Sequence, residues 1–226
     1  RNVLRNKEKY LIIPNDHKKP YLTLHNEILK KFNVEINDSD FKIIKYENTS
    51  KINCPNSLIK FINNYTLLHV DEKWFSKYYI NDYSDIAPKV DNFLYFIENL
   101  ISKLNQNLII TTGLINLPFI NELKKRFYNI INSNFYEYNF KNFKAILMLK
   151  SSVEQLEIIS MNSRNIILCQ GALTQVAGSF NIDLFDIIDG TREQWYDRHT
   201  FHIKKYNKLF RKNFKDLSKE IILTIK

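Results

Sequence analysis

The chain has 226 residues, of which 44% are hydrophobic, and this is enough for a substantial core in one large domain or one domain plus part of a second. The formal net charge of +9 lies at the two ends, with +5 in residues 1–31, +6 in residues 192–226 and −2 between them. The longest apolar runs, such as Ala145–Leu149, are far too short to cross a bilayer, and no charged-then-apolar leader opens the chain. We therefore expect a soluble protein.

The cysteines and the basic ends bear on the cellular setting. Cys54 and Cys169 show no metal-ligand spacing and no disulfide framework, which favours a reducing cytoplasm. The basic ends favour contact with an anionic surface, such as a phosphorylated glycolipid, a membrane or nucleic acid, although solvated helix faces explain the same charge. We predict a cytoplasmic protein, and the basic ends allow peripheral contact with anionic lipid at the inner membrane face.

The first 60 residues predict a partial N-terminal α/β segment. A short strand at residues 9–14 stops at Pro14, and a polar turn precedes a helix from Leu22 to Phe32. A weak strand candidate at Phe41–Ile44 is followed by a polar stretch, residues 47–57, which is the best candidate linker. We place the domain boundary near residue 60.

Beyond the boundary, residues 61–226 alternate between apolar strands and amphipathic helices. The predicted strands are residues 65–70, 108–111, 134–138, 145–149, 165–169 and 183–188, and the predicted helices are residues 89–104, 117–131, 153–160 and 172–180. Residues 201–226 have apolar side chains at helical spacing and predict a C-terminal docking helix. Apolar strands alternating with helices are typical of a parallel sheet covered on both faces, so we predict an α/β, Rossmann-like domain.

Ligands of open parallel sheets bind outside the carboxyl ends of the strands, and the turn from Cys169 into the helix after it is the strongest candidate site. Gly171 and Ala172 leave backbone N–H groups approachable at a helix start, which favours a phosphate. Thr174 offers a hydroxyl and Gln170 an amide, with Leu173 between them in the same turn. Alternatively, Gly171 only permits close packing of helix against strand.

Two further strand ends supply polar groups. His69, Asp71 and Lys73 follow the first strand of the domain, and the lysine is suitably placed to meet a phosphate charge. His69 also fits a hydrogen-bonded core histidine, and Asp71 with Lys73 fits a local ion pair. The turn after the next strand holds Thr111, Thr112 and Gly113, and it can line the same cleft.

Candidate proton acceptors lie near the N terminus, where Asp16, His17 and His25 accompany basic residues. Solvated turn residues are the alternative interpretation of this group. Near the C terminus, His199 and His202 have i, i+3 spacing, but no carboxylate or cysteine completes a ligand set, so we predict no metal site. The chain has no Walker loop, G-x-G-x-x-G motif, zinc cysteine quartet or G-x-S-x-G elbow, which argues against ATPase, dehydrogenase and esterase activity.

The segment order from His69 onward resembles the C-terminal half of GT-B glycosyltransferases, most closely the heptosyltransferase-like family. The resemblance covers residues 60–226 and rests on residues 69–75, 109–113 and 163–189, which match in layout with a few shared residues. In that family the last segment holds a strand, a glycine turn and an alanine-rich helix that bind the donor diphosphate. This chain departs from the pattern at Gln170 and Gln175, where such proteins often have acidic residues or histidine.

The resemblance implies a GT-B-type donor-binding domain and an inverting, metal-independent transfer of a hexose or heptose. The donor would be a nucleotide-diphosphate sugar, with no other cofactor, and the acceptor an envelope glycan or lipopolysaccharide-type glycolipid. Lys73 and the Gly171–Thr174 turn would hold the diphosphate, and Asp16 or His17 would be the base. A complete GT-B enzyme has a full N-terminal domain, so we expect that domain to be reduced or to lie outside this sequence.

A non-catalytic, Rossmann-like module that binds a nucleotide or a glycan is the alternative function. Nucleic-acid binding rests on charge alone, since no motif supports it, and we do not expect a nucleic-acid partner.

Overall fold

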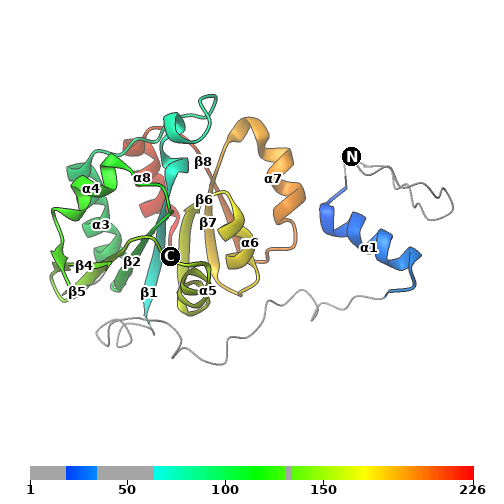
Figure 1. Cartoon of the computed structure of the whole chain (residues 1–226), viewed down its shortest axis with the longest axis horizontal. Coiled ribbons are helices and arrows are strands. Elements are labelled where there is room, and N and C mark those ends of the chain that lie inside the picture. Colours follow the sequence, from blue (N-terminus) through cyan, green and yellow to red (C-terminus); the bar gives the residue numbers. More distant parts are fainter. Residues whose placement is uncertain (1–18, 35–63, 131–133) are drawn as a thin grey trace.

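The computed structural model describes residues 19–34, 64–130 and 134–226, whose main body consists of three layers (Figure 1). Within these residues an eight-stranded sheet, in the order β3-β4-β5-β2-β1-β6-β7-β8, forms the middle layer. Helices cover both faces, so the predicted α/β fold with a Rossmann-like, mostly parallel sheet is confirmed. The predicted strands at 9–14 and 41–44, the linker at 47–57 and the boundary near residue 60 lie outside the described residues.

Most strands of the sheet are parallel, and the central ones are buried along nearly their whole length because helices cover both of their faces. The parallel strands are β1 (Tyr65–Val70), β2 (Asn107–Thr112), β5 (Phe143–Met148), β6 (Asn165–Cys169), β7 (Asp183–Ile188) and β8 (Tyr206–Phe210). At one edge, β3 (Tyr128–Asn129) and β4 (Phe135–Phe140) are antiparallel, which the sequence pattern did not predict.

The helices bury two separate apolar clusters, one on each face of the sheet (Figure 1). One face holds α3 (Val90–Leu104), α4 (Pro118–Lys124) and α8 (Phe214–Thr224), and the other holds α5 (Val153–Asn162) and α6 (Ala172–Gly178). The remaining elements are α1 (Tyr21–Lys31), α7 (Glu193–Thr200) and the short 3₁₀ helices η4 (Glu72–Trp74), η5 (Ser76–Tyr78) and η6 (Gly190–Arg192). No helix among the described residues combines the length and hydropathy needed to cross a bilayer.

Local signals explain why several helices begin and end where they do. The buried side chains of α3 recur at helical spacing, and the helix ends at Asn105, whose φ of 51° is the left-handed cap conformation. In α5, Ser152 and Gln155 form a reciprocal capping box at the N terminus. Asn213 starts α8 by accepting a hydrogen bond of 3.1 Å from the amide of Asp216.

Two predicted helices are corrected by the structure. The helix predicted over residues 117–131 ends at Lys124, because the chain tightens into i→i+3 turns that bury Phe127 against the ring of Tyr138. The docking helix predicted over residues 201–226 is instead β8 followed by α8. Residues 206–210 pair with β7, since the open backbone groups at that sheet edge favour a further strand over a helix.

The strand order reverses between β1 and β6. From β1 the chain builds the sheet outward through β2 and β5, and it then returns to the other side of β1 for β6, β7 and β8. In open parallel sheets the crevice at such a reversal, outside the carboxyl ends of the two strands, is where ligands bind. The loops after Val70 and Cys169 therefore define the place to look for a site.

Candidate functional site

The structure brings Lys73 and Gly171 together at the reversal. Lys73 lies in η4, directly after β1, and Gly171 lies between β6 and α6. A Cβ atom on Gly171 would be 3.1 Å from Cε and 3.2 Å from Nζ of Lys73, which is tighter than ordinary contact. Glycine at this position therefore lets the lysine ammonium lie against the backbone of the β6–α6 turn.

Asp71 holds Lys73 in place. The Lys73 ammonium donates a hydrogen bond to Oδ2 of Asp71, and the Lys73 amide donates to Oδ1 at 3.1 Å. Burial raises the pKa of Asp71, but His69 and Lys73 together outweigh it, so the pKa is below its ordinary value. Burial lowers the pKa of Lys73, but the charge of Asp71 and its hydrogen bond outweigh it, so that pKa is raised. Both side chains are charged at neutral pH.

His69 is a hydrogen-bonded, buried histidine, as one of the two sequence interpretations has it. Its Nδ1 lies 2.9 Å from Oγ1 of Thr111, and its Nε2 lies 3.5 Å from Oδ2 of Asp71. Only 6% of His69 is exposed. The hydrogen-bonded pair of His69 and Thr111 therefore lies beside Asp71 and helps to hold its carboxylate in place.

The other residues predicted after β2 have structural contacts. Gly113 permits close packing of two loops, since a Cβ there would be 3.1 Å from Oε2 of Glu72 and 3.2 Å from Cβ of Asp71. The hydroxyl of Thr112 accepts a hydrogen bond of 3.1 Å from the amide of Lys150, beside β5 and on the far side of β2 from β1. Gly113 thus allows the loops around the site to pack closely. The Thr112 hydroxyl is directed toward Lys150 and away from Gly171.

Gln170 is the unusual member of the β6–α6 turn. It is 6% exposed, and neither its side-chain oxygen nor its nitrogen has a hydrogen-bond partner among the described residues. A buried polar group without a partner costs about 1–3 kcal/mol, which is tolerated where a ligand supplies the partner. The Gln170 amide is therefore a candidate ligand contact.

Of the other residues in that turn, Thr174 and Leu173 have structural contacts and Ala172 lies on the surface. The hydroxyl of Thr174 accepts a hydrogen bond of 3.1 Å from the Gly171 amide, so Thr174 shapes the turn and leaves the Gly171 N–H satisfied. Leu173 packs against the core cluster on the α5–α6 face, and Ala172 is exposed. Lys73 supplies a full positive charge directly beside this turn.

Sequence reasoning missed two residues beneath the turn, the buried Asp186 and the partly buried Tyr206. Asp186, in the middle of β7, is completely buried, and Oδ2 accepts a hydrogen bond of 2.9 Å from the hydroxyl of Tyr206. Burial raises the pKa of Asp186 to about 7, although Tyr206, Thr174 and Lys73 oppose the shift. A carboxylate between apolar residues inside a strand was the available signal for Asp186; nothing local indicated Tyr206.

Arg211 was also missed, and it fastens the loop that follows β1. Its guanidinium donates through Nε at 3.0 Å and Nη2 at 2.8 Å to the carbonyl of Ser84, and through Nη1 at 3.7 Å to Sγ of Cys169. The guanidinium also lies 5.3 Å from the ring centroid of Tyr83. The loop carrying Lys73 is thereby tied to the ends of β6 and β8.

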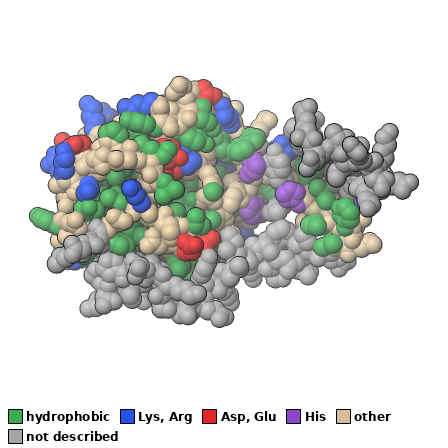
Figure 2. Space-filling model, viewed as in Figure 1, with side chains coloured by type: hydrophobic (Ala, Val, Ile, Leu, Met, Phe, Trp, Pro, Cys, Tyr) green, Lys and Arg blue, Asp and Glu red, His purple; other side chains and the backbone are tan. Residues whose placement is uncertain are grey.

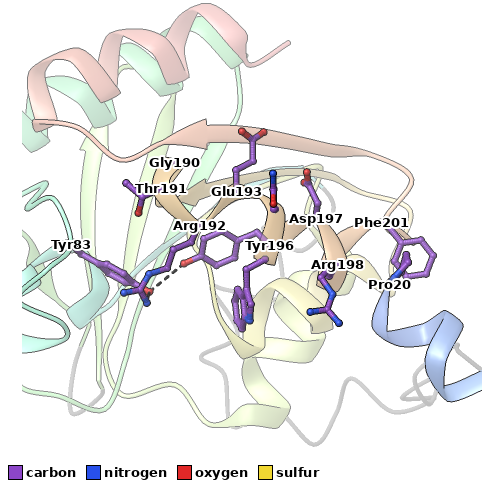
Figure 3. A pocket seen from close by; sticks show the side chains of 12 residues that line it. Pro20, Tyr83, Gly190, Thr191, Arg192, Glu193, Tyr196, Asp197, Arg198 and Phe201 are labelled. Atoms are coloured by element: carbon purple, nitrogen blue, oxygen red, sulfur yellow. Dashed lines mark hydrogen bonds between the residues drawn. The ribbon is translucent and has the colours of Figure 1, made fainter. Parts of the chain in front are cut away.

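An open hollow of about 1160 Å³ lies beside this site, between η6, α7 and the start of α1 (Figure 3). Tyr83 and Arg192 form one wall, where Nη1 of Arg192 donates to the Tyr83 hydroxyl at 3.3 Å. Pro20 and Phe201 lie at the opposite end of the hollow (Figure 3). The hollow and the Lys73 site occupy the same carboxyl edge of the sheet.

The predicted catalytic residues Asp16 and His17 lie outside the described residues. His25 is exposed on α1. In the part of the chain that the structure describes, no group of three or more His, Cys, Asp and Glu side chains is placed to hold a metal ion, and this includes the surroundings of His199 and His202.

The basic residues do not form one continuous patch on the face shown in Figure 2. Lysine and arginine side chains of the described residues are dispersed there among apolar and uncharged polar ones.

Fold and site together define a Rossmann-like α/β domain with a lysine packed against a glycine turn at its strand-order reversal. Comparison with models of known protein families and with curated proteins finds no match.

Proposed function

We propose that the chain is a GT-B-type glycosyltransferase that binds a nucleotide-sugar donor at the carboxyl ends of β1 and β6. The sugar would pass to an envelope glycan or a lipopolysaccharide-type acceptor. The observation that carries this proposal is the close packing at the strand-order reversal, where an added Cβ on Gly171 would lie 3.2 Å from Nζ of Lys73.

The Lys73 ammonium suits a diphosphate. An ammonium has three N–H donors, and the hydrogen bond to Asp71 uses one of them, which leaves donors for phosphate oxygens. Asp71 orients the ammonium, and its negative charge reduces the attraction for a diphosphate, so we expect moderate affinity. The unpartnered amide of Gln170, one residue before Gly171, would bind a hydroxyl group of the donor.

In the proposed inverting reaction, the acceptor oxygen forms a bond to the anomeric carbon while the bond from that carbon to the diphosphate breaks. The nucleoside diphosphate leaves with the electron pair, and Lys73 stabilises the negative charge that develops on it. The proton of the acceptor hydroxyl passes to a base, for which Asp16 and His17 remain the predictions. No metal ion takes part in the proposed mechanism.

Binding of UDP, GDP and ADP, measured by calorimetry, tests the donor site. We expect at least one of them to bind, and K73A to weaken that binding by about tenfold or more, which corresponds to about 1.4 kcal/mol. K77A is the matched control, because Lys77 lies on the same loop but is exposed, over the ring of Tyr78. Failure of all three nucleotides to bind, or equal effects of K73A and K77A, would contradict the proposal.

A binding module without turnover is the second candidate function, and one observation favours it. His69 and Asp71 at this sheet edge, and Asp186 in the middle of β7, are buried and engaged in hydrogen bonds or ion pairs, so none is exposed to an acceptor hydroxyl. Release of nucleoside diphosphate from UDP-, GDP- or ADP-sugars, with and without glycan acceptor, separates the two functions. Release supports the transferase, whereas binding without release supports the module.

A further inference from the structure

The carboxyl group of Asp186 lies inside the protein, below the turn that carries Gly171. Asp186 pairs with Leu168 of β6, and Gln170 lies two residues further along the same face of that strand. α6 covers this face of β6 and β7 (Figure 1). Asp186 is 0% exposed, and its Oδ1 has no hydrogen-bond partner among the described residues. The proposed donor site therefore lies above a buried carboxyl group.

Two side chains connect Asp186 with the groups that would bind the diphosphate. The Thr174 hydroxyl accepts a hydrogen bond of 3.1 Å from the Gly171 amide, and the same side chain favours the ionised form of Asp186. The positive charge of Lys73 favours the ionised form as well. A ligand that changes the surroundings of Lys73 or Gly171 therefore changes the free energy of ionising Asp186.

A bound diphosphate would act against the ionised form of Asp186. Its negative charge offsets the ammonium of Lys73 and repels a nearby carboxylate, and both effects favour the protonated acid. Burial already raises the pKa of Asp186 to about 7, so the free protein is only partly protonated in the neutral range. An anion at Lys73 is thus bound more strongly when Asp186 is protonated.

We propose that the donor site takes up a proton together with the diphosphate, and that Asp186 receives this proton. The proton comes from the solvent, and Oδ1, the oxygen without a partner among the described residues, is the atom that can accept it. The inference rests on the proposed transferase function and concerns the regulation of its donor site by pH. Because the complex holds the proton more tightly than the free protein, donor affinity is highest at low pH and falls as the pH rises through the neutral range.

The other ionisable groups next to Asp186 keep their charge states in the neutral range. In β8, burial raises the pKa of Tyr206, and hydrogen bonds to two carboxylates of α7 raise the pKa of Lys208. In β6, burial raises the pKa of the Cys169 thiol well above its ordinary value. Burial lowers the pKa of Lys73, but the neighbouring carboxylate outweighs burial and the pKa is raised. The remaining pair at this sheet edge, His69 and Asp71, lies in and after β1, on the far side of β6 from β7.

Calorimetric titration with UDP-, GDP- and ADP-glucose, in two buffers of different ionisation enthalpy, measures the proton uptake directly. Nucleotide sugars are the probes because the terminal phosphate of a nucleoside diphosphate itself titrates at about pH 6, and a nucleotide sugar has no such group. For at least one of them we expect uptake of roughly half a proton per ligand near pH 7.5. Its affinity should be about fivefold or more stronger at pH 6 than at pH 8.5, which corresponds to a rise of about one unit in the pKa of Asp186 on binding.

Asp186→Asn should abolish both the proton uptake and the difference in affinity between pH 6 and pH 8.5. The matched control is Asp183→Asn at the other end of β7, where the carboxylate is 50% exposed and lies 3.9 Å from Nζ of Lys205. This control should keep the uptake and the pH dependence of the wild type. Uptake that persists in Asp186→Asn would assign the proton to another group, such as His69, and would overturn the inference.

Tyr206→Phe provides a second test that keeps the carboxyl group. The Tyr206 hydroxyl donates a hydrogen bond of 2.9 Å to Oδ2 of Asp186 and favours its ionised form, so its removal raises the pKa of Asp186 further. The midpoint of the affinity change should therefore move to higher pH by about half a unit or more. Tyr128→Phe, at a position that is 74% exposed, should leave the midpoint in place. A midpoint that stays or moves to lower pH in Tyr206→Phe would contradict the role of Asp186.

The outcome for the donor site is separable from the outcome for proton uptake. Nucleotide-sugar binding that depends on Lys73, but takes up no proton and is equally strong at both pH values, would reject this inference and keep the donor site. Failure of every nucleotide and nucleotide sugar to bind at either pH would reject both.

Discussion

The hydroxyl of Tyr206 donates a hydrogen bond of 2.9 Å to Oδ2 of Asp186, a carboxyl group that is completely buried in β7. The other oxygen, Oδ1, has no hydrogen-bond partner among the described residues. Burial raises the pKa of Asp186 from 3.8 to about 7, so this carboxyl group is close to half ionised at neutral pH. The protein therefore has a titrating group inside its core, directly below the β6–α6 turn.

Asp186→Asn should make the protein more resistant to rising pH. The unfolded chain loses this proton at about pH 4 and the folded protein only at about pH 7, so ionisation favours unfolding and lowers stability between those values. From pH 5 to pH 8 the free energy of unfolding of the wild type should fall by on the order of 2–3 kcal/mol through ionisation of Asp186. The Asn variant should not show this decrease. Urea denaturation at both pH values measures the difference. Equal pH dependence in both proteins would show that Asp186 does not titrate in this range.

Tyr206→Phe should destabilise the protein more at pH 8 than at pH 5. The hydroxyl stabilises the ionised carboxylate more strongly than the neutral acid, so the expected loss is about 1–3 kcal/mol at pH 8 and less at pH 5. Tyr128→Phe is the control, because Tyr128 lies in β3 and is 74% exposed. An unchanged free energy of unfolding at pH 8 would contradict a strong bond from Tyr206 to Asp186.

Asp71→Asn should be strongly destabilising, because it leaves the largely buried Lys73 ammonium without its counter-charge. The expected loss is about 3 kcal/mol near neutral pH. The stabilisation that comes from ionised Asp71 is fully present above the ordinary aspartate pKa. It disappears as the pH falls through the lowered pKa of Asp71. The stabilisation that comes from protonated Lys73 is fully present below the ordinary lysine pKa, and it disappears as the pH rises through the raised pKa of Lys73.

Thermal unfolding of the wild type and of Asp71→Asn from pH 3 to pH 11, on the order of one scan per pH unit, checks this pH range. A uniform offset between the two curves would argue against the ion pair.

Trp74→Phe should weaken both stability and the loop that carries Lys73. The indole is completely buried, packs against Phe93 and Phe214, and donates through Nε1 to the carbonyl of His69 at 3.0 Å. Loss of volume and of this bond should cost about 2–4 kcal/mol in the free energy of unfolding. W195F, at a half-exposed position, should change stability by less than about 0.5 kcal/mol. Similar values for the two variants would contradict the structural role of Trp74.

Gly171→Val should weaken nucleotide binding with little loss of stability. A side chain at residue 171 would push against Cε and Nζ of Lys73, and the far end of a lysine moves at small cost. Stability should change by less than about 1 kcal/mol, while UDP, GDP or ADP affinity falls by roughly tenfold. Ala172→Ser is the control in the same turn, since Ala172 is exposed. A large loss of stability in the glycine variant would point to helix–strand packing as the role of Gly171.

Much of the fold could be predicted because the signals for it are local. β1, β6 and β7 have the predicted bounds to within a residue, since each is an apolar run set off by polar residues. The C-terminal segment was predicted wrongly, because Tyr206, Leu209 and Phe210 fit helical spacing as well as a strand. Only the open edge of β7 decides between the two, and that edge is not visible in the local sequence.

The candidate site, like the fold, could be predicted only in part from local signals in the sequence. The ends of the apolar strands can be recognised in the sequence, and they indicated Lys73 and Gly171 as two separate candidates. Their contact required the parallel pairing of β1 with β6, across about a hundred residues of sequence. The pairing of Asp186 with Tyr206, the bonds of Arg211 to the loop after β1, and the hollow at α7 depend on long-range packing as well. The residue types and their order thus specify which groups are available. Their protonation, burial and proximity come from the tertiary structure, because dielectric environment and distance between strands are properties of the folded chain.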